Sequence, residues 1–150
     1  MKKDAEEWIN RYVDAYMVVT RQINARLRDI FGEGLTTDQF LILRLISGQE
    51  RCTSTYLAEA VAVGKSSITA IINRLDEAGM IQRTRDENDR RQVYLTMTEY
   101  GQSVYKTSEK QMQQVISPYL FHFEDDNIEQ FITMFEKLAF LMQDTGGRSN

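Results

Sequence analysis

The sequence has 150 residues, an apolar share of 42% and a formal charge of −4, which suits one globular domain with a buried core. No apolar run approaches the roughly 18 residues of a membrane span, and none follows the lysines at the amino terminus, so we expect a cytoplasmic protein without a membrane partner. One cysteine and one histidine exclude an intrachain disulfide and the usual four-ligand zinc site, and without a catalytic triad or phosphate loop we expect no enzyme, cofactor or metal.

The negative charge is unevenly distributed along the chain. Residues 64–96 carry six basic and five acidic side chains, whereas residues 97–150 carry four basic and eight acidic ones. The acidic surplus therefore belongs to the last third. A protein that binds a polyanion can have this distribution if the basic side chains of the middle segment gather on one surface.

The first two predicted elements are helices. Residues 5–30 are predicted to form one long amphipathic helix, and Gly32 and Gly34 end it. Thr36 and Gln39 have the spacing of a capping box that opens a second helix, which ends at Ser47-Gly48. The apolar positions of these two helices are Ile9, Tyr12, Val13, Tyr16, Ile23, Leu27 and Ile30, and then Phe40, Leu41, Leu43, Leu45 and Ile46.

Two shorter helices are predicted next. The third begins at Thr53 or Ser54, and a tight turn at Val63-Gly64 leads into the fourth. Gly79 is placed to end the fourth helix. The inward positions are Leu57, Ala58 and Val61 in the third helix and Ile68, Ile71, Ile72 and Leu75 in the fourth. Two short helices joined by a tight turn containing glycine form the helix-turn-helix pattern.

After Gly79 the apolar period changes to that of strands. Residues 81–85 and 92–96 are predicted to pair as a hairpin whose polar tip is the segment DENDRR. A hairpin directly behind a helix-turn-helix is called a wing. Two more helices follow, one over residues 98–116 that Pro118 interrupts and one from about Asp125 to Met142. The last helix has an apolar stripe of Ile128, Phe131, Ile132, Phe135, Leu138 and Met142.

The outward face of the fourth helix carries polar side chains that suit the major groove of DNA. Lys65, Ser66, Thr69 and Asn73 are expected opposite the isoleucine stripe. Base edges in that groove present distinct donors, acceptors and methyl groups, and the first residues of such a helix lie nearest to them. Ser67, like Lys65 and Ser66, can also contact phosphate. The alternative is that these short side chains only cap and solvate a surface helix.

The predicted tip of the wing carries two arginines next to carboxylates. Arg90 and Arg91 follow Asp86 and Asp89. An arginine held out by a short carboxylate suits the minor groove, where a narrow cleft concentrates negative potential. A solvated charged turn is the alternative. The order of a groove-reading helix followed by an arginine wing makes a joint signal for double-stranded DNA that neither feature gives separately.

The segment GKSSITAIINRLDEAGMIQRTRDENDRRQVYLTMTEYG resembles the MarR family of bacterial regulators. The resemblance rests on the RL-x-x-x-G step, the D-x-x-D-R-R run and the strand that ends in Leu-Thr before a helix start with glycine. The upstream LAEAVAV resembles the family's positioning helix, and the whole chain fits the family's length and layout. The resemblance implies a mainly α fold with a small β wing, in which a winged helix-turn-helix region is embedded between dimerisation helices.

The resemblance also implies domain organisation and site residues. One domain, 1–150, would hold a DNA-binding region, 36–97, between dimerisation helices at 1–35 and 98–145, and the homodimer would bind a pseudo-palindromic operator. Arg91 would be the wing-tip arginine that Asp89 orients, and Arg90 a phosphate contact. The contact positions of the recognition helix would be Lys65, Ser66, Ser67, Thr69 and Arg74. Departures from the family pattern are Gly64, Ala70 and Asn73, and Asn73 is expected to read an adenine edge.

The resemblance further implies a switch. Small aromatic or phenolic effectors would bind the repressor and release it from DNA. Tyr12, Tyr16, Met17 and Phe40 are the candidates for the ligand pocket, with core packing as the alternative. A second reading is an oxidant-sensing repressor through Cys52, whose pKa Arg51 would lower; the alternative there is a small buried residue in a strand that pairs with the wing. A helical adaptor that binds proteins and no DNA is the third reading.

Overall fold

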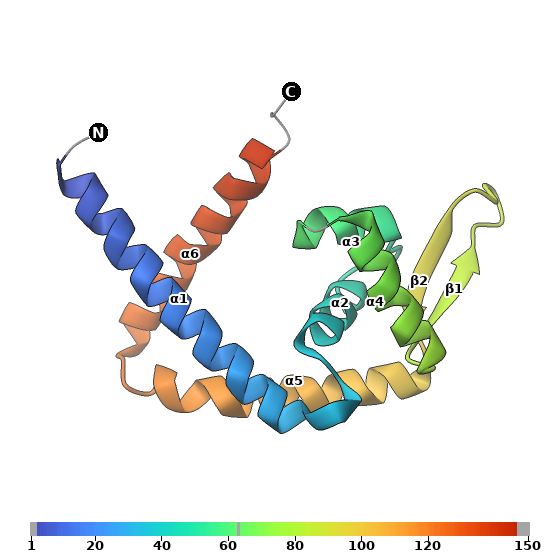
Figure 1. Ribbon diagram of the computed structural model, residues 1–150, viewed down its shortest axis with the longest axis horizontal. Coiled ribbons are helices and arrows are strands. Elements are labelled where there is room, and N and C mark those ends of the chain that lie inside the picture. Colours follow the sequence, from blue (N-terminus) through green and yellow to red (C-terminus); the bar gives the residue numbers. More distant parts are fainter. Residues whose placement is uncertain (1–2, 63, 147–150) are drawn as a thin grey trace. The chain divides into compact units, whose positions relative to one another are not determined.

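The computed structural model describes residues 3–62 and 64–146 and is mainly helical with one two-stranded sheet, which confirms the expected fold class (Figure 1). The chain forms two compact units, Met1–Val115 and Ile116–Asn150. The elements in chain order are α1 (Lys3–Phe31), the short 3-10 helix η1 (Gly32–Gly34), α2 (Thr37–Ser47), α3 (Ser54–Val61), α4 (Lys65–Glu77), β1 (Ile81–Arg85), β2 (Val93–Met97), α5 (Glu99–Leu120) and α6 (Asp125–Gly146).

The predicted start of α2 is confirmed in detail. The Thr36 hydroxyl oxygen accepts a hydrogen bond from the backbone N–H of Gln39 at 3.0 Å, and the Gln39 side chain accepts one from the N–H of Thr36 at 3.0 Å. These two bonds satisfy donors that a helix start otherwise leaves without partners. Gly32 takes a positive φ of 66°, which lets the chain turn after α1.

The buried face of α2 differs from the prediction at two positions. Ile42 is 1% exposed although it was not predicted to be apolar core, and Leu41 is 41% exposed although it was. The reason is helical period, because the buried residues Phe40, Leu43 and Ile46 lie at three-residue steps and Ile42 stands one turn before Ile46. Leu41 lies beside this stripe.

The helix-turn-helix is formed by α3 and α4, which pack against one another (Figure 1). Thr53 caps α3 by accepting a hydrogen bond from the N–H of Tyr56 at 3.1 Å. Ala62 ends α3 in the left-handed conformation, with φ 53°. The predicted turn at Val63-Gly64 falls partly on residue 63, which lies outside the described residues.

Gly79 ends α4 as predicted, with a φ of +74°. The N–H of Met80 donates to the carbonyl of Leu75 at 3.0 Å, and the N–H of Gly79 donates to the carbonyl of Asp76 at 2.9 Å. This bonding pattern is the usual way to end a helix at a glycine. It sends the chain directly from the recognition helix into the wing.

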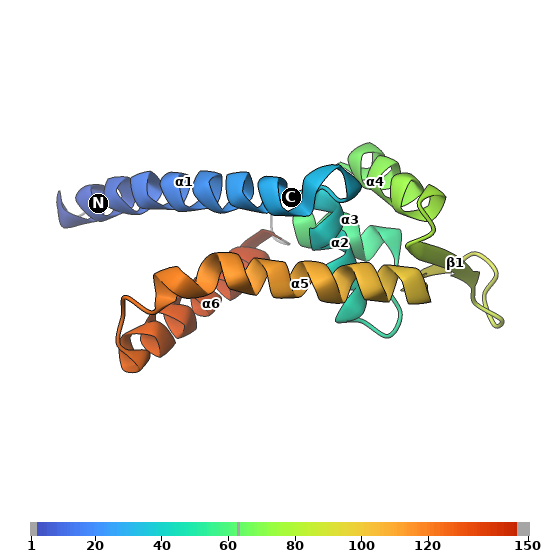
Figure 2. The same ribbon diagram turned by 90° about the horizontal axis from the view of Figure 1, so that it is seen from below.

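The wing is an antiparallel hairpin in which Ile81 pairs with Met97 and Arg85 with Val93. Strand β2 begins one residue later than the predicted 92–96. Cys52 pairs with β2 from outside the hairpin, because its carbonyl accepts a hydrogen bond from the N–H of Leu95 at 2.7 Å. The hairpin projects beyond α4 in both views (Figures 1 and 2).

A single apolar core joins these elements within the first unit. Leu43, Leu57 and Leu75 are each fully buried, and they come from α2, α3 and α4. Strand β2 contributes Leu95 and helix α5 contributes Tyr105. The core therefore fixes the recognition helix and the base of the wing on the same support.

The start of α5 approaches the end of α4 closely. Thr98 donates from its hydroxyl to the carbonyl of Gly79 at 2.6 Å and accepts from the N–H of Gly101 at 3.0 Å. A β-carbon built on Gly101 would overlap the carbonyl oxygen of Met80. Glycine at this position is what permits the contact.

The prediction that Pro118 interrupts the fifth helix is wrong, because α5 continues to Leu120. The missing N–H of Pro118 removes one helical hydrogen bond without ending the helix, and the N–H of Phe121 still donates to the carbonyl of Ser117 at 3.2 Å. Within the described ranges no helix has both the length and the apolar character that crossing a membrane requires.

Candidate nucleic-acid interface

Helix α4 presents one buried face and one exposed polar face. Ile68, Ile72 and Leu75 are 0 to 3% exposed, and Ile71 is half-buried against the same core. The six side chains of α4 that were predicted to contact DNA are all exposed: Lys65, Ser66, Ser67, Thr69, Asn73 and Arg74. The prediction that the face opposite the isoleucine stripe is exposed is therefore confirmed, and its contact with DNA stays a prediction.

The donors and acceptors on this face are not equally available. The Thr69 hydroxyl donates to the carbonyl of Lys65 at 2.8 Å, so Thr69 offers an outside partner its lone pairs and methyl group. Gly64 stands at the cap position of α4 and supplies no side-chain hydrogen bond to the first turn. The first turn is thus open to an anionic group.

Asn73 is held by a residue that the sequence reasoning missed. Arg83, on β1, donates to the Asn73 amide oxygen and forms an ion pair with Asp76. A two-bond contact with adenine needs both the oxygen and the N–H group of an asparagine side chain. Arg83 already donates to the Asn73 oxygen, so a two-bond contact with adenine requires that oxygen to accept a second hydrogen bond. The pairing depends on the distance between β1 and α4, which no sequence motif marks.

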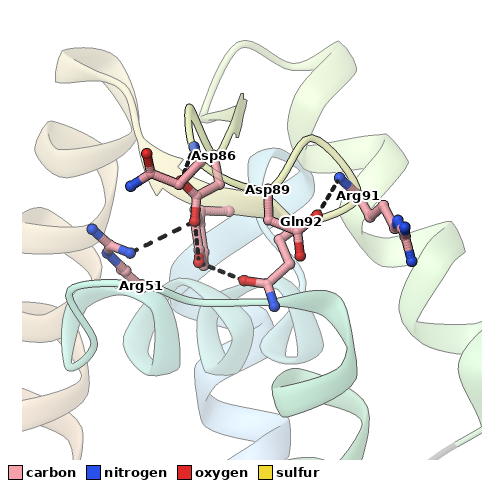
Figure 3. Close-up of polar contacts among 7 residues, drawn as sticks. Arg51, Asp86, Asp89, Arg91 and Gln92 are labelled. Carbon is pink, nitrogen blue, oxygen red and sulfur yellow. Dashed lines mark hydrogen bonds and ion pairs between the residues drawn. The ribbon is translucent and has the colours of Figure 1, made fainter.

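The tip of the wing is a turn that Asp89 organises. Its carboxylate accepts a hydrogen bond from the backbone N–H of Arg91 at 3.1 Å, and its carbonyl accepts one from the N–H of Gln92 at 3.0 Å. The expected orientation of Arg91 by a carboxylate therefore acts through the backbone and not through an ion pair. The Arg91 side chain points away from Asp86, and Arg90 is also exposed (Figure 3).

A second polar cluster, formed by Arg51, Asp86 and Tyr94, lies where the two strands of the wing meet its loop. The guanidinium of Arg51 lies 3.8 Å from the carboxylate of Asp86 and 5.3 Å from the centre of the Tyr94 ring (Figure 3). The Tyr94 hydroxyl lies 3.1 Å from the Asp86 carboxylate and 2.7 Å from the side-chain oxygen of Gln92. Sequence reasoning named Asp86 only as a neighbour of the wing arginines and gave Tyr94 no role.

The electrostatics of Asp86 follow from these partners. The backbone N–H of Asn88 donates to its carboxylate at 2.9 Å, and this hydrogen bond is the main cause that lowers the pKa of Asp86 below its ordinary value. The hydroxyl of Tyr94 and the charge of Arg51 lower it further, against an opposing effect of desolvation. Asp86 is therefore a carboxylate at neutral pH.

Cys52 is fully buried, and its surroundings differ from those expected of a reactive thiol. Burial raises the pKa of Cys52 to about 11, so the expectation that Arg51 lowers this pKa is wrong. The Arg51 side chain turns to Asp86 and Tyr94 instead. In the described part of the chain, no group of three or more histidine, cysteine or acidic side chains is placed to hold a metal ion.

The candidates for a ligand pocket lie in two environments. Tyr12, Tyr16 and Met17 are 42 to 48% exposed on α1, where the two tyrosine rings stack at 5.8 Å. Phe40 is buried between Phe31 and Tyr105, as the core-packing alternative expects. None of these four residues lines the hollow of about 470 Å³ that lies elsewhere in the first unit, beside Leu41, Arg44, Leu45, Ser47, Gly48, Gln49, Tyr56, Tyr105 and Glu109.

Comparison with known proteins supports the reading from geometry. The MarR family model matches residues 35–93. The uncharacterized HTH-type transcriptional regulator YwhA of Bacillus subtilis (strain 168) is 31% identical over 98 residues, which are 65% of this chain and 70% of that protein. The homoprotocatechuate degradative operon repressor of Escherichia coli is 24% identical over 107 residues, which are 71% of this chain and 72% of that protein.

A solved structure extends the likeness to nearly the whole chain. The crystal structure of the transcriptional regulator BldR from Sulfolobus solfataricus covers 93% of this chain and 98% of its own, with 26% sequence identity and a TM-score of 0.75. The helix-turn-helix, the hairpin behind it and these likenesses agree, and the chain belongs to the MarR family of DNA-binding transcriptional regulators.

Proposed function

We propose that this protein is a cytoplasmic homodimeric repressor that binds a pseudo-palindromic operator and leaves it when a small aromatic effector binds. The observation that carries the proposal is the pairing of an exposed polar face on α4 with an arginine-bearing wing on one buried core. A protein-binding adaptor has no need of two exposed arginines at the tip of a hairpin, so we do not favour that alternative.

In the proposed complex, α4 enters the major groove. Lys65, Ser66 and Ser67 lie in its first turn, where the open helix start favours a phosphate, and Thr69 and Arg74 face the base edges further along. Asn73 contributes N–H donors while Arg83 holds its oxygen. These donors suit a base edge with an acceptor, such as N7 of a purine.

The wing is proposed to reach the neighbouring minor groove. Arg91 enters the groove, Arg90 contacts phosphate, and Asp89 keeps the turn in shape through the N–H of Arg91. Each phosphate contact makes the affinity fall with salt, by about 0.9 in log affinity per log unit of salt concentration.

A second copy of the chain is proposed to cover apolar surface on α1 and α6. On α1, Trp8 is 63% exposed and Val18 is 62% exposed; on α6, Phe131 is 59% exposed and Phe140 is 67% exposed. Apolar side chains exposed in such numbers along helices mark an interaction surface. A twofold dimer would also present two copies of α4 to successive major grooves, as an operator with two half-sites requires.

The proposed effector is a small aromatic or phenolic compound. The relative from Escherichia coli is a repressor of an operon for homoprotocatechuate degradation, which favours a small aromatic compound here as well. Tyr12, Tyr16 and Met17 are the proposed contacts on α1 because they are exposed and two of them stack. The buried thiol of Cys52 argues against oxidation as the switch. Release of bound operator on titration with benzoate-type acids and phenols would identify the effector class.

The proposal is tested with a duplex selected by the protein from a random-sequence DNA pool. Arg91→Ala is expected to weaken binding by about tenfold or more, because it removes the groove contact of the wing. Lys106→Ala removes the same charge from an exposed position on α5 and is expected to bind like the parent. Fluorescence anisotropy at two salt concentrations measures both, and equal affinities for Arg91→Ala and the parent would contradict the proposed wing contact.

A further inference from the structure

The polar cluster of Arg51, Asp86 and Tyr94 is not accounted for by the proposed DNA contacts. Arg51 comes from the connection between α2 and α3, and the other two residues come from the part of the hairpin next to its loop. Asp86 stands just after β1, and Tyr94 lies within β2. The cluster therefore ties the segment that precedes the helix-turn-helix to the loop end of the wing (Figure 3).

The backbone supports the same connection. The carbonyl of Cys52 accepts from the N–H of Leu95 at 2.7 Å, and the next residue, Thr53, caps α3. The N–H of Asp86 donates to the carbonyl of Gln92 at 3.0 Å and closes the loop at the point where the hairpin ends. Arg51 is thus the first of three consecutive residues that link the wing to the helix-turn-helix.

The charges in the cluster make its effect on DNA binding distinguishable from simple electrostatics. Asp86 carries a negative charge on the wing, where a bound polyanion would be repelled. If Asp86 acted only through its charge, its removal would strengthen DNA binding. If it holds the wing, its removal weakens binding, because a loose wing must be ordered when the complex forms.

We propose that Arg51 is a positioning residue for DNA binding, which fastens the wing through Asp86 and Tyr94 at the point where the two strands meet the loop, and so fixes the wing tip relative to α4. The inference rests on the proposed wing contact of Arg91. The contact geometry within the tip is set by Asp89, whereas the direction in which the whole hairpin points is set by this cluster. Arg51 is exposed over 69% of its side chain and Asp86 over 15%, so the tie lies at the surface and its loss leaves the core intact.

The test compares Asp86→Asn with Glu87→Gln, using the dimeric full-length protein and the selected duplex. Asparagine still accepts a hydrogen bond from the N–H of Asn88 but loses the charge that pairs with Arg51. Asp86→Asn is expected to weaken binding by about fivefold. Glu87→Gln makes the same change of charge one residue away, on an exposed side chain, and is expected to bind as tightly as the parent or slightly more tightly.

Two further variants separate positioning from direct contact with DNA. Arg51→Gln is expected to weaken binding about as much as Asp86→Asn. The double variant is expected to bind no more weakly than the single variant with the lower affinity, because each substitution removes the same interaction. In the Asp86→Asn background, Arg91→Ala is expected to have a smaller effect than in the parent. Hydroxyl-radical footprints would lose protection in the flanking minor groove and keep it under α4.

The outcomes distinguish the two proposals. If Arg91→Ala weakens binding and Asp86→Asn binds like Glu87→Gln, the positioning role is overturned while the wing contact stands. If Arg51→Gln weakens binding and Asp86→Asn does not, Arg51 touches DNA itself and the positioning role is again overturned. If Arg91→Ala binds like the parent, the proposed wing contact is contradicted, and the positioning role that rests on it is overturned as well. Should Asp86→Asn unfold, the Arg51→Gln footprint decides, since loss of protection under α4 as well would overturn the inference.

Discussion

Helices α4 and α6 have the same kind of sequence pattern but opposite surroundings. The apolar stripe of α4 is 0 to 3% exposed at Ile68, Ile72 and Leu75, whereas that of α6 is 37 to 66% exposed at Leu138, Phe135 and Met142. An amphipathic period therefore determines that a helix forms and which face is apolar. It does not determine whether that face packs within the chain or stays exposed on its surface.

The largest expected effect comes from a substitution in the buried apolar stripe of α4. Leu75→Ala removes a fully buried side chain and is expected to lower the free energy of unfolding by about 3 kcal/mol, because it leaves a cavity in the core. Leu138→Ala removes the same atoms from the α6 stripe and is expected to have an effect that depends on protein concentration. Urea unfolding at two protein concentrations measures both. Equal, concentration-independent losses would mean that the two stripes are covered in the same way.

The next effect tests what covers α6. Phe135→Glu places a charge on the exposed stripe and is expected to weaken the proposed dimer by about thirtyfold, because that charge would be buried in the proposed interface. Lys137→Glu also adds negative charge but lies outside the predicted stripe, and it is expected to leave the dimer largely intact. Sedimentation equilibrium compares the two variants with the parent, and a Phe135→Glu protein as dimeric as Lys137→Glu would remove α6 from the interface.

The smallest effect uses the buried thiol as a probe of the covered region. Because the folded thiol of Cys52 has a pKa of about 11 against 9.0 in the unfolded chain, the folded state retains its proton to higher pH. Its contribution is complete below pH 9 and is lost as the pH rises toward 11. Relative to Cys52→Ala, the parent is expected to lose stability progressively over this interval, because the unfolded chain releases the proton first. The free energy of unfolding of the parent and of Cys52→Ala is measured across this pH interval. If the two change in parallel with pH, the thiol is open to solvent.

Patterns within one element were predicted well from the sequence. The capping box at Thr36 and Gln39, the glycine that ends α4 and the bounds of β1 all follow from local spacing, and the structure confirms them. Membership of the MarR family confirms the expectation that the protein is a transcription regulator rather than an enzyme.

Contacts between elements were not predicted, since they depend on distances that the sequence does not encode locally. Arg83 holds Asn73 across ten residues, and Arg51 reaches Asp86 across 35. The Pro118 prediction failed for a related reason: a proline removes one helical hydrogen bond, and whether the helix ends there depends on the bonds that form on both sides of it.

The sequence by itself determined the helices, their caps, the hairpin and the polar face of α4, because backbone propensity and apolar period act over a few residues. Only the tertiary structure decided that Asp89 bonds the backbone of Arg91, that Arg83 takes the oxygen of Asn73, and that Arg51 turns from Cys52 to Asp86. These choices depend on which partner lies within hydrogen-bonding distance once the core has set the elements in place.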